Sequence, residues 1–188
     1  MRWIAVAFAA LVSVSAPADA STVSGLKPAQ PSAEALKPGL ATEHLRILVR
    51  HVDEIERAGK GRQGPPLPAL DNSVGTGEDV LGSGEAEGIA FRIRGFLKIE
   101  KPGVYEFATM SNDGVRFQLD GKTIVDDPDV HPDRLSDATA VELQQGWYPL
   151  YVLYFQRKGS WTIELLWKAP GMADFEPVPA AHFAHLPN

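Results

Sequence analysis

The feature that most constrains this chain is a change to period-two alternation at residue 89. From there to residue 168, apolar side chains alternate with polar ones in a series of short runs. Such alternation is typical of strands with one buried face and one solvated face. Residues 147–156 are apolar on both faces and are expected to form a central strand. The apolar members of the alternating runs include Ile89, Phe91, Ile93, Leu97, Tyr105, Phe107, Val115, Phe117, Leu119, Trp161, Ile163 and Leu165.

Tight turns separate these runs. Pro102-Gly103, Gln145-Gly146 and Lys158-Gly159-Ser160 are turn sequences, and Asp120-Gly121 is a two-residue hairpin signal because both positions tolerate positive φ. About seven strands follow one another without intervening helices, which excludes a parallel sheet. The sequence therefore predicts a mainly β fold, an antiparallel two-sheet β-sandwich.

The segment before the strands has a different pattern. Leu45, Leu48, Val52 and Ile55 share one helical face, which predicts an amphipathic N-terminal helix over residues 44–57. The rival interpretation makes residues 40–48 the first strand of the sheet. Residues 59–88 are rich in glycine and proline and are expected to form a long loop, either functional or wrapped over the surface.

The N-terminus predicts export. Arg2, an apolar run over residues 4–14 and the small-x-small site Ala18-Asp19-Ala20 are typical of a signal peptide over residues 1–20, cleaved after Ala20. A flexible leader rich in Pro, Ser and Ala is expected over residues 21–38, followed by one domain over residues 39–188. The protein is thus expected to be secreted or periplasmic. The lack of cysteine fits a bacterial exported protein.

Composition excludes several partner classes. The formal net charge is −6, and the basic residues are scattered. Such a chain is a poor nucleic-acid binder and offers no basic patch for anionic lipid. After the signal peptide, no run is apolar enough to form a transmembrane segment.

A set of short motifs resembles the PA14 domain family. They are Gly103-Val104-Tyr105-Glu106-Phe107, Ser111-Asn112-Asp113-Gly114-Val115-Arg116-Phe117, Leu119-Asp120-Gly121-Lys122, His131, Gly146-Trp147-Tyr148-Pro149-Leu150, Tyr154-Phe155, Leu165-Leu166-Trp167-Lys168-Ala169-Pro170-Gly171 and Pro177-Val178-Pro179-Ala180. The resemblance is clearest over residues 88–186. It implies a β-sandwich found in bacterial toxins, adhesins, glycosidases and other exported proteins, and several such domains bind sugars through calcium.

The loop at residues 111–114 is the first candidate site. In the sugar-binding relatives an Asp-Asp pair holds calcium there, and the resemblance carries this role to Asn112 and Asp113. Asn112 supplies a neutral oxygen in place of a charged one, so weaker calcium binding is expected. The alternative is that Asn112-Asp113-Gly114 is simply a turn, because these residues accept turn geometry.

The acidic loop at residues 126–134 is the second candidate site. Three carboxylates within four residues, those of Asp126, Asp127 and Asp129, could complete a cation site or bind sugar hydroxyls. The candidate ligand-binding residues of this loop are Asp127, Asp129, His131, Asp133 and Arg134. The alternative is a solvated loop. His131 matches a histidine position common in the family, and a role in holding the loop by a hydrogen bond is preferred for it.

The positions of the tryptophans and the absence of catalytic motifs bear on how the protein could bind sugars or act as an enzyme. Trp147, Trp161 and Trp167 stand in alternating strands, which favours core packing over stacking on sugar rings. No serine-hydrolase, zinc-protease or phosphate-loop motif is present. The sequence thus predicts a non-enzymatic module that binds a carbohydrate or cell-envelope glycan, with calcium as the only cofactor considered. The alternative is a non-catalytic structural or protein–protein interaction domain of the cell envelope, without a bound cation.

Overall fold

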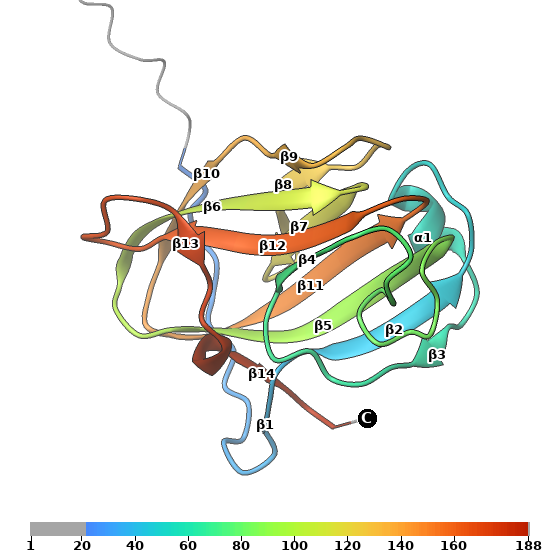
Figure 1. Ribbon diagram of the computed structural model, residues 1–188. Coiled ribbons are helices and arrows are strands. Elements are labelled where there is room, and N and C mark those ends of the chain that lie inside the picture. The colour runs from blue at the N-terminus through green and yellow to red at the C-terminus, as the bar shows by residue number, and fades with distance from the viewer. Residues whose placement is uncertain (1–21, 188) are drawn as a thin grey trace, which may run out of the picture.

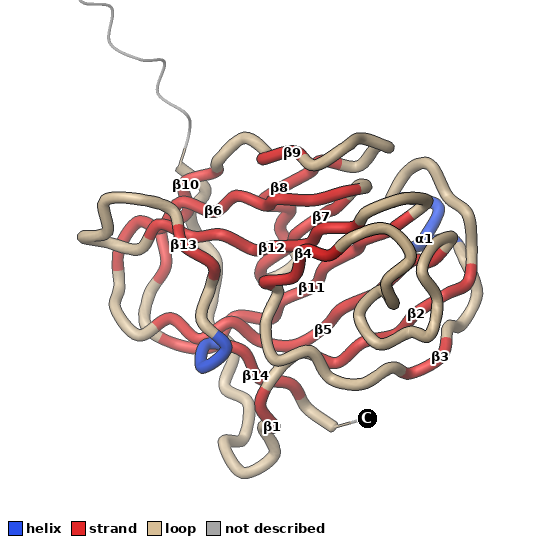
Figure 2. Tube along the Cα trace, in the orientation of Figure 1, coloured by secondary structure: helices blue, strands red, loops and turns tan. Residues whose placement is uncertain are grey.

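The computed structural model describes residues 22–187. Over this range the fold is mainly β and consists of two packed antiparallel sheets (Figures 1 and 2). The mainly β antiparallel sandwich predicted from the alternation is therefore confirmed. The signal-peptide prediction for residues 1–20 lies outside the described residues. Among the described residues, no helix is long and apolar enough to cross a membrane.

The first sheet is built around two long strands, β5 (Ile89–Ile99) and β11 (Gly146–Gln156), which pair over their whole length. On the far side of β11 follow β7 (Val115–Leu119) and β8 (Lys122–Asp127). The other edge of β5 is shared by β2 (Ala41–Arg46) and β14 (Phe183–His185). Two-residue strands β3 (Arg62–Gln63) and β1 (Lys37–Pro38) extend this edge.

The second sheet is centred on β6 (Gly103–Asn112) and β12 (Trp161–Lys168). The outer edge of β6 pairs with β10 (Thr139–Leu143) and with the short β9 (Arg134–Leu135). The outer edge of β12 pairs with β4 (Asp71–Val74) and β13 (Glu176–Pro177). A 3-10 turn at Ala180–His182 leads into β14.

The core lies between the sheets and contains the apolar members of the alternating runs. Phe107 of β6 and Phe117 of β7 join the two layers, with ring centroids 5.6 Å apart. Both side chains are fully buried, and burying one phenylalanine contributes about 1.5–3 kcal/mol. The Asp120-Gly121 hairpin also forms as predicted, because both residues have positive φ, 48° and 72°, between β7 and β8.

The helix predicted over residues 44–57 is wrong for most of its length. Residues 41–46 form β2, and the helix α1 covers only Asp53–Arg57. The rival strand interpretation is closer, because backbone pairing of β2 with β5 outweighs the helical spacing. Leu48, expected on the packed face, is 55% exposed. The other apolar residues of the pattern are buried in a small second cluster on the outer face of the first sheet.

Residues 22–38, expected as a flexible leader, lie against the sandwich. The backbone of Val23 bonds to Ala140 and Glu142 of the second sheet, and Ala29 N–H donates to the Trp147 carbonyl of the first. Lys27 N–H also donates to Asp120 at the hairpin, 2.9 Å away. In Figure 1 this segment leads along one end of the sandwich into β1.

Candidate functional site

The two loops singled out from the sequence lie side by side. The first connects β6, which ends at Asn112, to β7, which begins at Val115. The second leaves β8 at Asp127 and returns through β9. Because Ser111 and Arg134 are paired residues of β6 and β9, the acidic loop folds back beside residues 111–114.

Asn112 and Asp113 are buried, at 9% and 4% exposure, and a cis peptide bond joins them. The Asn112 carbonyl accepts a hydrogen bond from the Tyr154 hydroxyl at 2.7 Å. The Asp113 carboxylate accepts one from the Arg157 backbone N–H, with 2.8 Å between Oδ2 and N. These bonds tie the loop to β11 and to the turn after it, so the loop is held in one position.

Burial raises the pKa of the Asp113 carboxyl above its usual range. The hydrogen bond from Arg157 N–H and the nearby His131 and Arg157 side chains act in the opposite direction but do not cancel the effect of burial. A buried carboxylate disfavours its charged form because it has lost water.

Asp127, His131 and Arg134 form a connected cluster in the second loop. The Asp127 carboxylate accepts hydrogen bonds from Nε of Arg134, at 3.0 Å, and from its Nη2. His131 Nε2 lies 3.3 Å from Asp127 Oδ2, and His131 Nδ1 lies 2.8 Å from the Pro132 carbonyl. Asp127 and His131 are buried, whereas half of the Arg134 side chain is exposed. The buried Asp127 carboxylate thus fixes the orientation of the half-exposed Arg134 guanidinium.

Asp129 and Asp133 are exposed. The hydrogen bond to Asp127 chiefly raises the pKa of Arg134, and the negative charge of Asp129 contributes to raising it. The loop is packed closely at Gly114, where an added Cβ would lie 2.7 Å from the carbonyl oxygens of Pro128 and Asp129. Glycine is therefore required there for the two loops to come this close.

A polar hollow of about 470 Å³ adjoins this cluster. Its walls include Asp127 and Arg134, together with Asp126, Ser136 and Asp137. The Arg116 guanidinium donates to Asp126 at 2.7 Å and to Asp53 at 2.6 Å, and so holds the Asp126 carboxylate in place. The hollow presents carboxylate, hydroxyl and guanidinium groups within one small space, which suits a ligand rich in hydroxyls.

Three contributors to this region were not predicted from the sequence. Arg116 alternates with core residues along β7, and nothing local marks it as a bridge between two aspartates. Tyr154 and Arg157 lie more than forty residues from the loop that they hold. The sequence did predict the Lys158-Gly159-Ser160 turn, which follows Arg157 directly. Its place beside Asn112 follows from the pairing of β12 with β6.

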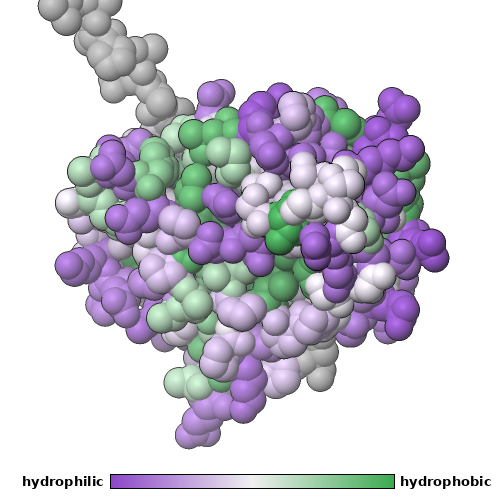
Figure 3. All heavy atoms as spheres, viewed as in Figure 1, coloured by the Kyte–Doolittle hydropathy of each residue, from purple (hydrophilic) through white to green (hydrophobic). Residues whose placement is uncertain are grey.

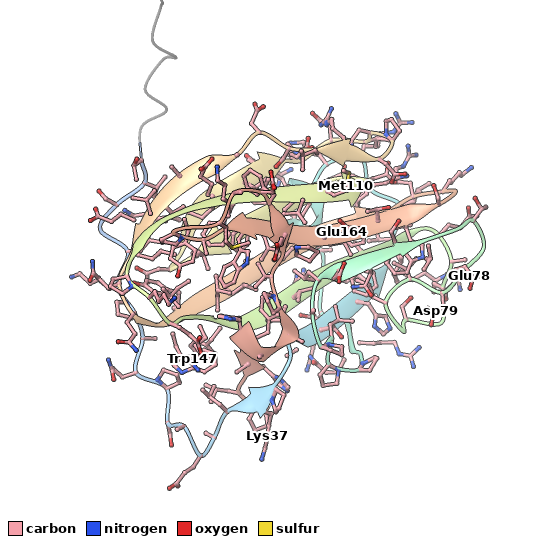
Figure 4. The ribbon with its side chains drawn as sticks, turned by 60° about the vertical axis from the view of Figure 1, so that its left-hand side comes forward. Lys37, Glu78, Asp79, Met110, Trp147 and Glu164 are labelled. Atoms are coloured by element: carbon pink, nitrogen blue, oxygen red, sulfur yellow. The ribbon has the colours of Figure 1, made fainter. Side chains whose placement is uncertain are left out.

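The tryptophan prediction is correct for two residues of three. Trp161 and Trp167 are buried in the core, at 3% and 6% exposure. Trp147 is half-buried and, with Lys37, lines a hollow of about 310 Å³ on the outside of the first sheet (both are labelled in Figure 4). Its odd position on β11 directs it outward, because the even positions of that strand face the core.

The sequence matches the PA14 domain over residues 68–180, which is more than half of the chain. The chain belongs to the PA14 domain family. A search of curated proteins found no significant match. Similar solved structures therefore provide the remaining comparisons for this PA14 domain.

One similar structure is an anti-sigma factor domain-containing protein, with a TM-score of 0.67 and 19% identity; the match covers 80% of this chain and 48% of that one, about half its length. A PA14 sugar-binding domain from an RTX adhesin matches with a TM-score of 0.61 and 15% identity, and the match covers 79% of this chain and 98% of that one. The epithelial adhesin 9 A domain from Candida glabrata, in complex with Galβ1-4GlcNAc, matches with a TM-score of 0.66 and 12% identity. The match covers 88% of this chain and 97% of that one. At these identities the likeness shows the fold.

Several oxygens of the two loops already have hydrogen-bond or ion-pair partners. Oδ2 of Asp113 accepts the Arg157 N–H, and the backbone carbonyl of Asn112, as distinct from its side-chain amide oxygen, accepts the Tyr154 hydroxyl. Asp127 is neutralised by Arg134. Over residues 22–187, no group of three or more His, Asp or Glu side chains is arranged to hold a metal ion. Calcium usually takes six to eight oxygens, often from several carboxylates.

Proposed function

We propose that this PA14 domain is an exported, non-enzymatic module that binds a carbohydrate through the adjoining loops 111–114 and 126–134. The observation that carries the proposal is the bonded pair of Asp127 and Arg134 on the wall of a polar hollow, with His131 beside Asp127. Carboxylate and guanidinium groups held rigidly in one hollow can bind several sugar hydroxyls at once. The similar sugar-binding domain of the RTX adhesin and the epithelial adhesin domain in complex with Galβ1-4GlcNAc support a carbohydrate as the ligand class.

In this proposal, Arg134 and Asp127 contact the ligand and the other residues position them. Arg134 donates from its exposed half, while Asp127 holds it on the buried side. Asp113 and Tyr154 keep the first loop against β11 and so keep the wall of the site in place. Export through cleavage after Ala20 belongs to the same proposal, and the intact mass of the protein from its native host tests it.

Calcium enters the proposal as a weak ligand at most. With one buried carboxylate and one amide, affinity is expected in the range of the weakest calcium sites, about 10⁻⁴–10⁻³ M or weaker. Calorimetric titration of calcium into the wild type and Asp113→Ala measures this directly. Equal binding by the two proteins would place any calcium site elsewhere.

The experiment is a glycan array that includes galactosides, probed with purified protein in calcium and then in chelator. We expect binding to a defined set of glycans, and a loss of about tenfold or more in affinity for Arg134→Gln, because a charge-assisted hydrogen bond is removed. Asp174→Asn is the control, since Asp174 is exposed in the turn between β12 and β13, at the opposite end of β12 from Asn112.

Two outcomes would overturn the proposal. One is that correctly folded wild-type protein binds no glycan on the array, which favours a structural or protein-interaction role. The other is that Arg134→Gln and Asp127→Asn bind as well as the wild type, which removes these loops from recognition.

A further inference from the structure

A second groove lies on the outer face of the first sheet, away from the loops of the proposed carbohydrate site. It is a hollow of about 540 Å³ where β2, β5 and β11 run side by side. The strand register places Ala41 of β2, Arg94 of β5 and Tyr151 of β11 in one row, and Phe96 and Pro149 in the next. The helix α1 and the cluster around Ile55 cover the same face further along, and the groove begins where that cover ends.

Two guanidinium groups share one carboxylate at the wall of the groove. Glu43 accepts from Nη1 of Arg92 at 3.0 Å and from Nη1 of Arg94 at 3.1 Å. Arg92 is buried, and its guanidinium also donates to the carbonyls of Ile55, Ala58 and Gly59 at the end of α1. Arg94, in contrast, is 52% exposed and lines the groove.

The guanidinium of Arg94 is held in a defined orientation. Its Cζ lies 4.9 Å from the centroid of the Tyr151 ring, while Nη1 is bonded to Glu43 on the other side. Contact with an aromatic face and one ion pair reduce the freedom of the side chain before any ligand arrives. The planar fork of an arginine matches a carboxylate, which it can bind by two parallel hydrogen bonds.

Next to Arg94 the surface is apolar. Phe96, Pro149 and Leu150 line the groove beside the guanidinium, and Leu186 borders it. Figure 3 shows, for comparison, a face on which hydrophilic side chains predominate and apolar ones form small patches. A pyranose ring with a carboxylate offers one apolar C–H face and one anionic group, which matches this arrangement. A peptide would gain no strand pairing here, because the groove is a sheet face and not a sheet edge.

We propose that this groove binds an acidic saccharide, with Arg94 receiving the carboxylate of a hexuronate residue and Phe96 and Pro149 contacting its ring. This site is separate from the loops 111–114 and 126–134 and does not depend on their function.

The test is calorimetric titration with tetragalacturonate, using β-galactotetraose as a neutral probe. We expect binding of tetragalacturonate that weakens between about 50 mM and about 300 mM salt, because added ions screen the charge. Arg94→Gln should lose about tenfold or more in affinity. Arg46→Gln is the matched control, since Arg46 carries the same charge on β2 but is 79% exposed and pairs with Glu85 outside the groove.

A second measurement locates the ligand independently of the variants. Amide chemical-shift mapping with tetragalacturonate should show changes at Arg94, Phe96 and Tyr151. The inference is overturned if the wild type does not bind tetragalacturonate, if the neutral probe shifts the amides of Arg94, Phe96 and Tyr151 equally well, or if Arg94→Gln binds like the wild type. It is also overturned if the shifts appear at Asp113 and Asp127 instead, and that last result would leave the proposed loop site standing.

Discussion

The hydroxyl of Tyr154 donates to the backbone carbonyl of Asn112 across 2.7 Å, in a fully buried position. It joins the central strand of one sheet to the loop at the end of a strand in the other. This one bond therefore links the core of the sandwich to the candidate site.

Tyr154→Phe removes this bond and leaves the Asn112 carbonyl buried without its partner. We expect a loss of about 1–3 kcal/mol in the free energy of unfolding, measured by urea denaturation. Tyr148→Phe provides a control with the same chemical change, since the Tyr148 hydroxyl bonds to Gln144 near the other end of β11. Only Tyr154→Phe should shift the amide resonances of residues 112–114. An unchanged spectrum for that variant would refute the link.

The raised pKa of Asp113, caused chiefly by burial, predicts a dependence of stability on pH. The folded protein holds the Asp113 proton more tightly than the unfolded chain does, so ionisation of this group opposes folding. Its contribution is most favourable below the ordinary aspartate pKa of about 3.9 and is lost as the pH rises through the raised value.

Asp113→Asn removes this titration while keeping an oxygen to accept the Arg157 N–H. The difference in free energy of unfolding, variant minus wild type, should therefore shift in favour of the variant as the pH rises toward neutrality. Urea denaturation at a series of pH values measures it, with Asp174→Asn as the control. A difference that stays constant with pH would contradict the prediction.

Glu43→Gln tests the shared carboxylate in the first sheet. Burial raises the pKa of Glu43, but hydrogen bonds from Gly61 and Arg94 and the charge of Arg92 outweigh it and lower the pKa overall. The carboxylate thus contributes stability above the ordinary glutamate pKa, and this is lost as the pH falls through the lowered value.

Removing the charge leaves Arg92 buried with no carboxylate beside it. We expect a cost of about 3–5 kcal/mol, measured by denaturation at neutral pH. Glu100→Gln is the matched control, because Glu100 and its partner Lys98 are 57% and 41% exposed. If Glu43→Gln and Glu100→Gln unfold at the same urea concentration, the ion pairs of Glu43 with Arg92 and Arg94 do not stabilise the fold.

Ile55→Ala tests how the short helix is attached. Ile55 is fully buried in the cluster that includes Leu153 and Phe155, so the change should cost about 2–5 kcal/mol. Leu48→Ala removes an apolar side chain seven residues earlier that is 55% exposed, and its cost should stay below about 0.5 kcal/mol. Equal losses in thermal stability for Ile55→Ala and Leu48→Ala would mean that Ile55 does not attach the helix α1 to the first sheet.

The sequence by itself determined where the strands of the main sandwich run. Period-two alternation and turn residues are local signals, and they act through side-chain direction and allowed φ. That is why residues 89–168 and the Asp120-Gly121 hairpin could be predicted, and why the short motifs pointed to the PA14 domain family, which the match over residues 68–180 bears out.

Only the tertiary structure decided which segments meet. Residues 44–46 belong to a helical pattern, yet they form the end of β2 because β5 offers an edge to pair with. The pairing of β9 with β6 brings Asp127, His131 and Arg134 beside Asp113, and the pairing of β2, β5 and β11 brings Glu43, Arg92 and Arg94 together. Such contacts join residues far apart in the chain. They depend on strand order and register, which local periodicity does not specify.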